Sequence, residues 1–459
     1  MSLKSKPPKF EHDENNPFEN DKLERIYSAE LLTSLINSFE ENAVIAINSK
    51  WGTGKSTFIT MWSKMLNLHE YGYKTIVLNA WENDYCDDVM PFLVSEIGNG
   101  IDKYRSDKKQ VTLNGLKEAG TYLFKSSFNN AIKFASNGTI DPKKEYEYLV
   151  DQLTTKFSNE EINNYIKAKN QLIQFKKTLS SSVKDISNEK PLILFIDELD
   201  RCRPLFAIEV LEKIKHFFNV ENIIFVIAID KEQLGHSIGS VYGSGIDTNG
   251  YLKRFFDIEY QFPETKINNY IEYLLERFNF KQFYISHKQG VAEIADVLVN
   301  VCKIFALDLR TIEQCFSQLS IAFRIGEISS KTIHFMTFLL LLKSYDRILF
   351  ETYLENRKCD DLINRLRIID TKNFFSDSHT GVNIMAQIIS GVMTENAFEA
   401  YAEGTATGRG THPAVFTERG RKILNNVLPV LYNLGNYNHA EECINRINMV
   451  GEFNVKAAV

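Results

Sequence analysis

Residues 43–57 read AVIAINSKWGTGKST, and this stretch decides the fold. Its first part, Ala43–Ile47, is continuously apolar, which predicts a strand buried on both faces of a parallel sheet. The part from Ser49 to Ser56 matches the phosphate-binding loop pattern G-x-x-x-x-G-K-[ST], except that serine replaces the first glycine. A helix is predicted over Thr57–Leu66. A strand, a glycine-rich loop and a helix in this order direct backbone N–H groups and the positive helix end at phosphate.

The residues of this loop have distinct expected parts in holding a triphosphate. Gly52 and Gly54 let the backbone approach closely, because glycine has no Cβ. Lys55 is expected to reach the β- and γ-phosphates, and the Ser56 hydroxyl to be a ligand of Mg²⁺, with Thr57 a weaker candidate. The alternative is a plain glycine turn, which the serine at the first position leaves open because a Cβ is unfavourable wherever φ is positive. The predicted nucleotide-binding residues of the loop are Trp51, Gly52, Thr53, Gly54, Lys55, Ser56 and Thr57.

Two further apolar runs lead into acidic residues. Leu192–Ile196 runs directly into Asp197 and Glu198, and Ile223–Ala228 is followed by Asp230. Ligands bind at the carboxyl ends of parallel strands, so we expect the acidic pair and Lys55 to meet across neighbouring strand ends. Asp197 is predicted to hold Mg²⁺ through its water shell, and Glu198 is predicted to orient and deprotonate the attacking water. Asp230 is predicted to lie near the γ-phosphate or the water and to act on one of them. The alternatives are that the pair only caps a strand and that Asp230 only starts a turn.

Several arginines are candidates for contact with phosphate. Arg201 and Arg203 follow the acidic pair, where a guanidinium would neutralise transition-state charge in its own or a neighbouring subunit. Ion pairing within that loop, for instance with Asp200, is an equal alternative. Arg254 and Arg310 are the remaining candidates, both from the predicted helical region.

The rest of the pattern divides the chain into a sheet-containing core and helical parts. Thr75–Leu78 is another strand, and the order strand, helix, strand predicts a right-handed parallel crossover. Residues 101–190 are polar and mostly helical, which we interpret as an insertion. We expect a mobile lead-in at 1–20, a core at 21–100 and 191–265, a helical lid at 266–330 and a helical C-terminal region at 331–459. The predicted fold class is therefore α/β, a parallel sheet flanked by helices.

Composition and charge exclude several classes of protein. The chain has 459 residues, of which 44% are hydrophobic and 24% charged, as is typical of globular proteins. A net charge of -6 argues against a protein that coats duplex nucleic acid. The six cysteines lack the paired short spacing of a zinc site. The N-terminus lacks the apolar run of a signal peptide. The apolar run Phe338–Leu342 is too short to span a bilayer. We therefore expect a cytoplasmic protein without a membrane span.

The combination of motifs resembles the KAP family of P-loop NTPases. In that family the loop carries tryptophan before the central glycine, as Trp51 does here, and NAWEND at Asn79–Asp84 is similar to its Asn-x-Trp element. PLILFIDELDRCRP at Pro191–Pro204 resembles the family's acidic strand, and IIFVIAIDKEQL at Ile223–Leu234 the strand that follows it. YLKRFFDIEYQFP and LDLRTIEQ resemble later segments of the family. The resemblance covers residues 21–319 and does not explain the remainder of the chain.

The resemblance carries expectations of its own. It implies a sheet of the additional-strand type in which a glutamate, here Glu198, activates water. It also implies a sensor-like role for Arg310 and adenine contacts near Arg25 and Tyr27. Many members carry a pair of transmembrane helices where this chain has its insertion, but residues 101–190 are too polar to enter a bilayer. The chain is therefore most similar to a soluble, bacterial-type member.

Three functions remain open at this point. The leading hypothesis is a Mg²⁺-dependent ATPase that acts as a nucleotide-driven switch or assembly factor on an effector protein, with a homo-oligomer also open. The alternative is a DNA-stimulated motor or clamp, which the acidic balance and the lack of a recognisable DNA-binding module disfavour. The third is a binding module with an inactive site. We expect ATP rather than GTP, because no Asn-Lys-x-Asp element is present. The resemblance further implies a role in excluding phage or plasmids, usually with partner proteins.

Overall fold

The chain forms two compact units. The computed structural model describes residues 13–39, 42–86, 88–105, 111–120, 159–187, 190–264, 266–286, 291–324, 333–356, 359–390, 416–432, 443–447 and 449. We call the first unit the sheet unit, which comprises His12–Asp21 and Arg25–Pro263. The second, the helical unit, comprises Met1–Glu11, Lys22–Glu24 and Glu264–Val459.

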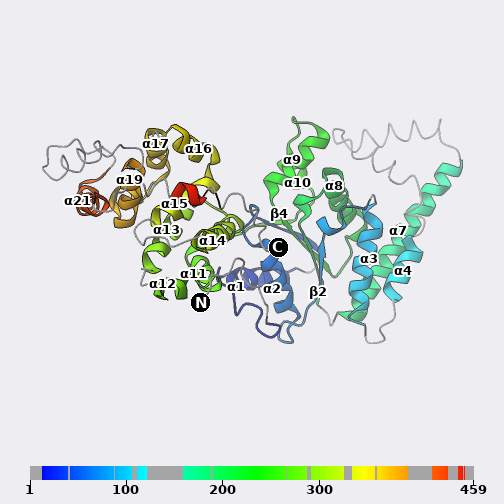
Figure 1. The fold of residues 1–459 in the computed structure, drawn as a ribbon. Coiled ribbons are helices and arrows are strands. Elements are labelled where there is room, and N and C mark those ends of the chain that lie inside the picture. Colours follow the sequence, from blue (N-terminus) through cyan, green and yellow to red (C-terminus); the bar gives the residue numbers. More distant parts are fainter. Residues whose placement is uncertain are drawn as a thin grey trace. The chain divides into compact units, whose positions relative to one another are not determined.

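A five-stranded sheet forms the centre of the sheet unit (Figure 1). Its order is β2-β3-β4-β1-β5, and the pairings between neighbours are parallel. Because β4 lies between β1 and β3, one extra strand separates the strand before the glycine-rich loop from the strand before the acidic pair. This is the additional-strand sheet that the resemblance implied, whereas our expectation that the loop and the acidic pair follow neighbouring strands is wrong. The strands are β1 (Ala43–Asn48), β2 (Lys74–Asn79), β3 (Leu192–Asp197), β4 (Ile223–Ile229) and β5 (Ile258–Gln261).

The strand β5 was not predicted from the sequence pattern. Its residues, IEYQ, alternate between half-buried and exposed, so it lacks the continuous apolar run that identified the others. It forms the edge of the sheet and pairs with β1, where Ile258 lies beside Ile45. By contrast, every residue of β3 and β4 is buried, which explains why their apolar runs were recognisable.

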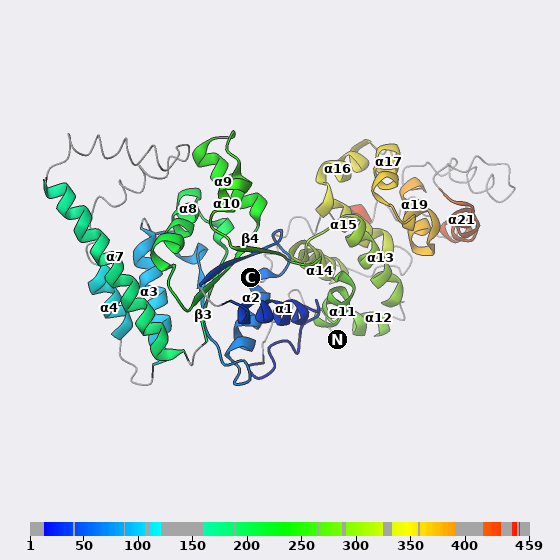
Figure 2. The same ribbon diagram turned by 180° about the vertical axis from the view of Figure 1, so that it is seen from behind.

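Helices cover both faces of this sheet. On one face, Trp62 of α2 packs edge-on against Phe195 of β3, and α1 packs on α2. On the other face, Leu194 and Ile196 share a hydrophobic core with α3 and α8. Side chains alternate along a strand, so Phe195 and its two neighbours reach opposite layers; Figures 1 and 2 show α1 and α2 grouped apart from α3 and α8. The helical elements of the unit are α1 (Ile26–Asn37), α2 (Lys55–Asn67), η1 (Trp81–Asn83), α3 (Val89–Asp102), α4 (Val111–Gly120), α7 (Asn159–Ile186), η2 (Leu199–Arg201), α8 (Pro204–Lys213), η3 (Ile214–Phe218), α9 (Lys231–Tyr242) and α10 (Thr248–Leu252).

The described part of the predicted insertion is helical. α4 and α7 pack against each other and against α3, and Phe175 and Leu179 of α7 are buried in the core that also contains the strands. Residues 106–110, 121–158 and 188–189 of the predicted insertion lie outside the described residues, as do residues 1–12 of the predicted lead-in.

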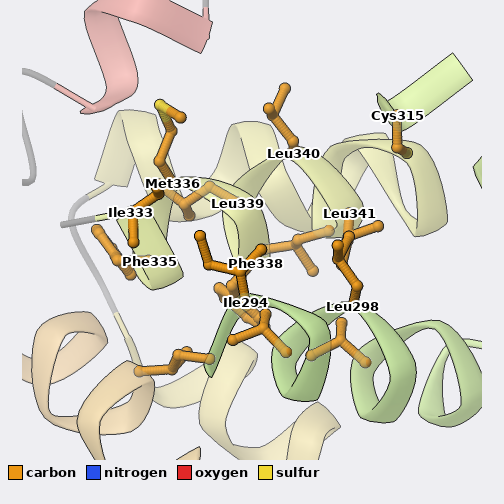
Figure 3. Close-up of a cluster of buried hydrophobic side chains, with 14 of the residues drawn as sticks. Ile294, Leu298, Cys315, Ile333, Phe335, Met336, Phe338, Leu339, Leu340 and Leu341 are labelled. Atoms are coloured by element: carbon orange, nitrogen blue, oxygen red, sulfur yellow. The ribbon is translucent and has the colours of Figure 1, made fainter. Parts of the chain in front are cut away.

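The helical unit is built around α15. All residues of α15 from Ile333 to Leu342 are buried, so this apolar run is the centre of a helical core. Figure 3 shows its side chains above Ile294 and Leu298 of α13, with Cys315 of α14 beside them. Among the described residues, no helix is both long enough and apolar enough to cross a membrane. The helices of the unit are α11 (Ile267–Arg277), α12 (Phe280–Ser286), α13 (Val291–Ile304), α14 (Leu309–Arg324), α15 (Ile333–Tyr345), α16 (Arg347–Asn356), α17 (Asp360–Ile369), α18 (Phe374–Asp377), α19 (His379–Ser390) and α21 (Glu418–Tyr432).

The contact between α3 and β2 leaves no room for a side chain at Gly100. A Cβ added there would lie 2.5 Å from Cδ1 of Ile76, which is itself a stiff, β-branched residue. We expect Gly100→Ala to lower the free energy of unfolding of the sheet unit by about 1–3 kcal/mol, because the added methyl group overpacks the core.

Gly239 in α9 is the matched control, since nothing lies within 4 Å of a Cβ added there. Gly239→Ala should leave stability unchanged or raise it by up to about 1 kcal/mol. Urea unfolding followed by circular dichroism measures both, and equal midpoints for the two variants would contradict the packing argument.

Candidate nucleotide-binding site

The glycine-rich loop joins the end of β1 to the start of α2. Gly52 and Gly54 have φ values of 75° and 87°, in the left-handed region that favours glycine. Ser49, which replaces the first glycine of the pattern, is not among the positive-φ residues of the described chain, so its side chain introduces no strain. Instead its hydroxyl donates to Thr53 Oγ1 at 2.8 Å, and its backbone N–H donates to the Ile229 carbonyl at the end of β4 at 3.0 Å. The serine therefore fits the loop.

Lys55 begins α2 and is 8% exposed. Its amine donates to the carbonyl oxygens of Ser49 and Lys50, so the side chain folds back over the loop. Burial lowers the pKa of Lys55, and three carboxylates oppose that shift, in the order Asp200, Asp230 and Asp197. The predicted phosphate-binding cation thus lies within the field of the acidic residues that end β3 and β4.

The two predicted magnesium ligands lie together. Asp197 ends β3 and is 8% exposed, and Ser56 follows Lys55 on α2. Burial raises the pKa of Asp197, and the Ser56 side chain opposes that shift. Ser56 and Thr57 are exposed, so their hydroxyls are accessible to a ligand. In the described chain no group of three or more His, Cys, Asp or Glu side chains is arranged to hold a metal. One carboxylate with one hydroxyl is nevertheless a suitable set for Mg²⁺, which keeps several waters and takes further oxygens from phosphates.

Glu198 has an unusual backbone conformation and two side-chain partners. Its φ of 59° and ψ of 26° are left-handed, a conformation that costs a residue with a Cβ about 1–2 kcal/mol. Asn79, at the end of β2, donates to Oε2 at 3.2 Å, and Arg201 forms an ion pair with Oε1 at 2.6 Å. The conformation and both contacts fix where this carboxylate points. Strain of this kind is common where a functional side chain must be aimed.

Asp230 has contacts that the sequence reasoning anticipated only in part. It is the N-cap of α9 and accepts a hydrogen bond from the Gln233 backbone N–H, which is the turn-starting alternative. It also accepts a hydrogen bond from the Trp51 backbone N–H at 3.1 Å, so its carboxylate lies against the loop. Both features are present at once, and a direct action on phosphate or water stays a prediction.

The candidate arginines outside the loop are placed differently. Arg25 is 2% exposed, its guanidinium lies 3.9 Å from the centre of the Phe262 ring, and it donates to the Pro263 carbonyl at 2.7 Å. These contacts indicate a packing role, and the adenine contact stays a prediction. Arg254 is exposed just after α10, and Arg310 is exposed near the start of α14 in the helical unit. Among the described contacts, neither of these two arginines touches the glycine-rich loop.

Two residues beside the predicted set were missed or undervalued. Asn79 was noted only as part of a family motif, although an amide at the carboxyl end of a parallel strand is itself a signal for a site. Asp200 was considered only as an ion-pair partner within its own loop. It is 6% exposed, accepts a hydrogen bond from the Trp51 indole N–H and acts electrostatically on Lys55.

Comparison with known proteins identifies one family. The model of the KAP family P-loop domain matches residues 25–325, which is more than half of the chain. No relative among curated proteins matches the sequence. The Aeropyrum pernix ORC1 protein in complex with DNA shares 13% identity over 94% of this chain and 84% of its own, with a TM-score of 0.29. The ADP form of the Aeropyrum pernix ORC2 protein shares 11% identity over 93% of this chain and 94% of its own, with a TM-score of 0.31. Neither similarity is strong enough to bear on function.

Proposed function

Because the chain belongs to the KAP family of P-loop domains, we propose that it is a Mg²⁺-dependent ATPase whose site lies where β1, β3 and β4 end. The observation that carries the proposal is the grouping of Lys55, Ser56 and Asp197. The Ser56 side chain opposes the rise that burial causes in the pKa of Asp197, and Asp197 acts electrostatically on Lys55, although β4 separates β3 from the strand that leads into the loop. A cation, a hydroxyl and a carboxylate are the groups that a metal-bound triphosphate needs.

Binding is assigned to the loop and the start of α2. The backbone N–H groups from Trp51 to Ser56 and the positive end of α2 receive the phosphates. To reach the β- and γ-phosphates, Lys55 exchanges its present carbonyl partners for phosphate oxygens, a stronger pairing because both groups are charged. Ser56 and Asp197 would hold Mg²⁺, directly and through water respectively. The metal, when bound, neutralises charge on the β- and γ-phosphates.

Hydrolysis is assigned to Glu198. Its carboxylate accepts a proton from a water as the water oxygen bonds to the γ-phosphorus and the bond to the β–γ bridging oxygen breaks. The left-handed backbone and the hydrogen bond from Asn79 support this assignment, because they aim the carboxylate. Arg201 pairs with Oε1 of Glu198, and Asn79 donates to Oε2, so the proton goes to a lone pair that neither contact uses. Arg254 and Arg310 remain proposed phosphate contacts, the latter as a sensor.

We expect hydrolysis to drive a switch that acts on an effector protein. Binding and release of the γ-phosphate would bias the conformation of the segments beside the site, as in other nucleotide switches. Exclusion of phage or plasmids is proposed on the family resemblance alone. Counting plaques on bacteria that carry the intact chain, or its Lys55→Ala variant, tests that role.

A steady-state phosphate-release assay tests the proposed activity. We expect release from ATP in the presence of Mg²⁺ and its loss when the metal is chelated, because without the metal only Lys55 and the loop N–H groups offset the phosphate charge. Duplex and single-stranded DNA are added in parallel at several salt concentrations. Strong, salt-sensitive stimulation would favour the motor or clamp instead, since binding to the DNA backbone weakens steeply with salt. No release from ATP under any of these conditions would contradict the proposal.

A further inference from the structure

A buried carboxylate links the phosphate loop to the neighbouring strand ends. Asp200 lies on η2, just past the end of β3, and is 6% exposed. Its Oδ2 accepts a hydrogen bond from the Trp51 indole N–H at 2.7 Å and another from the Asp230 backbone N–H at 2.6 Å. One oxygen atom thus joins segments that follow β3, β1 and β4.

Trp51 is held from two directions by this arrangement. Its indole N–H donates to Asp200, and its backbone N–H donates to the Asp230 carboxylate at 3.1 Å. Trp51 is 45% exposed, so packing contributes only part of what positions it. The polar contacts therefore account for much of the placement of the loop residue next to Gly52.

Asp200 is also the first counter-charge of Lys55. The charged groups that act on the Lys55 amine are Asp200, Asp230, Asp197 and, with opposite sign, Arg201. Burial lowers the pKa of Lys55, and among the nearby carboxylates Asp200 opposes this shift most strongly. Burial raises the pKa of Asp200, and Lys55 opposes that shift. Loss of the Asp200 charge would leave the amine buried with less compensation.

We propose that Asp200 is a positioning residue for nucleotide binding, which fixes the phosphate loop through its hydrogen bonds with Trp51 and with the Asp230 backbone. The inference rests on the proposed function, because it assigns to Asp200 the preparation of the same phosphate site. The proposed role of Asp200 differs from that of Glu198. Glu198 takes part in the chemical step, whereas Asp200 acts before it and through other residues.

The first experiment measures ATP binding by isothermal titration calorimetry with Mg²⁺. Asp200→Ala should raise the dissociation constant about ten- to a hundredfold, since a charge-assisted hydrogen bond and a counter-charge are lost together. Trp51→Phe, which removes only the indole donor, should raise it by less, about three- to tenfold. The double variant should bind about as weakly as Asp200→Ala alone, because the second change removes a contact already lost. Additive effects of the two changes would overturn the Trp51 part of the proposal.

A second variant separates the charge from the hydrogen bonds. Asp200→Asn keeps an acceptor oxygen for the two N–H groups but removes the negative charge. Asp200→Asn should therefore bind ATP more tightly than Asp200→Ala, because the hydrogen bonds from Trp51 and from the Asp230 backbone are kept. Equal affinities of the two variants would show that these hydrogen bonds do not position the loop, which would overturn the proposal.

Tryptophan fluorescence supplies a readout that needs no nucleotide. In a Trp81→Phe background only Trp51 and the fully buried Trp62 emit. Asp200→Ala should shift the emission maximum and increase quenching by acrylamide, whereas Asp200→Asn should not. Asp84→Asn is the matched control, because this carboxylate accepts hydrogen bonds from Arg203 and not from the loop.

The two proposals fail in different ways. If the intact chain does not bind ATP, the proposed function is wrong and this inference with it. If the intact chain binds ATP and Asp200→Ala binds it equally well, only the inference is wrong.

Discussion

Replacing Glu198 by Gln is expected to leave ATP binding intact and to slow hydrolysis by about 10²–10⁴-fold. Glutamine is isosteric, so the left-handed backbone and an acceptor for Asn79 are retained, whereas the proton acceptor is lost. The change also removes the ion pair with Arg201, which is partly exposed in the structure. Calorimetric titration with ATP and a single-turnover hydrolysis assay measure the two quantities separately.

An exposed carboxylate elsewhere in the sheet unit is the control for Glu198→Gln. Glu232 lies in the first turn of α9 and is exposed, so Glu232→Gln should change neither quantity. Full-speed turnover by Glu198→Gln would show that another group deprotonates the water. Loss of binding in the same variant would instead mean that Glu198 helps to shape the empty site.

Replacing Lys55 by Ala is expected to abolish tight binding of ATP. The variant removes a cation that is 8% exposed and that, on our assignment, pairs with two phosphates. Truncating one member of a buried, hydrogen-bonded charge pair typically costs about 2–5 kcal/mol, which corresponds to roughly thirty- to several-thousand-fold in the dissociation constant. Hydrolysis at subsaturating ATP should fall by at least the same factor. Calorimetric titration with ATP and Mg²⁺ measures the effect.

Lys50 provides the control for Lys55→Ala because it lies in the same loop but is exposed. Lys50→Ala removes the same formal charge and should alter affinity only slightly, since exposed charges are screened. Thermal unfolding checks that Lys55→Ala still folds, because the change leaves Asp197, Asp200 and Asp230 without their shared counter-charge. Equal affinities for the folded Lys55→Ala and Lys50→Ala proteins would contradict the assignment of Lys55.

The sequence was most informative where the chain is locally regular. The sequence pattern showed apolar runs at Ala43–Ile47 and in the strands β3 and β4, because a strand buried on both faces needs such a run. The loop motif and the carboxylates that directly follow the strands could therefore be located from the sequence alone. The short edge strand β5 could not, since exposed residues interrupt its apolar pattern.

Such local patterns did not predict contacts between segments that are far apart in the sequence. Trp51 and Asp200 are far apart in the sequence, and so are Asn79 and Glu198, yet each pair forms a hydrogen bond. The prediction that the loop and the acidic pair follow neighbouring strands was wrong because strand order is a property of the whole sheet. No local feature of β4 indicates that it inserts between β1 and β3.

By itself, the sequence determined that the chain contains a P-loop and a parallel sheet, and which residue types follow each strand. These features depend on local chemistry, namely the burial of apolar runs and the backbone freedom of glycine. The tertiary structure alone decided which strand ends meet, that the Ser56 side chain acts on Asp197, and that Asp200 accepts the Trp51 hydrogen bond and acts electrostatically on Lys55. The physical reason is that these contacts join separate strand ends, and only the packing of the complete sheet brings those ends within hydrogen-bonding distance.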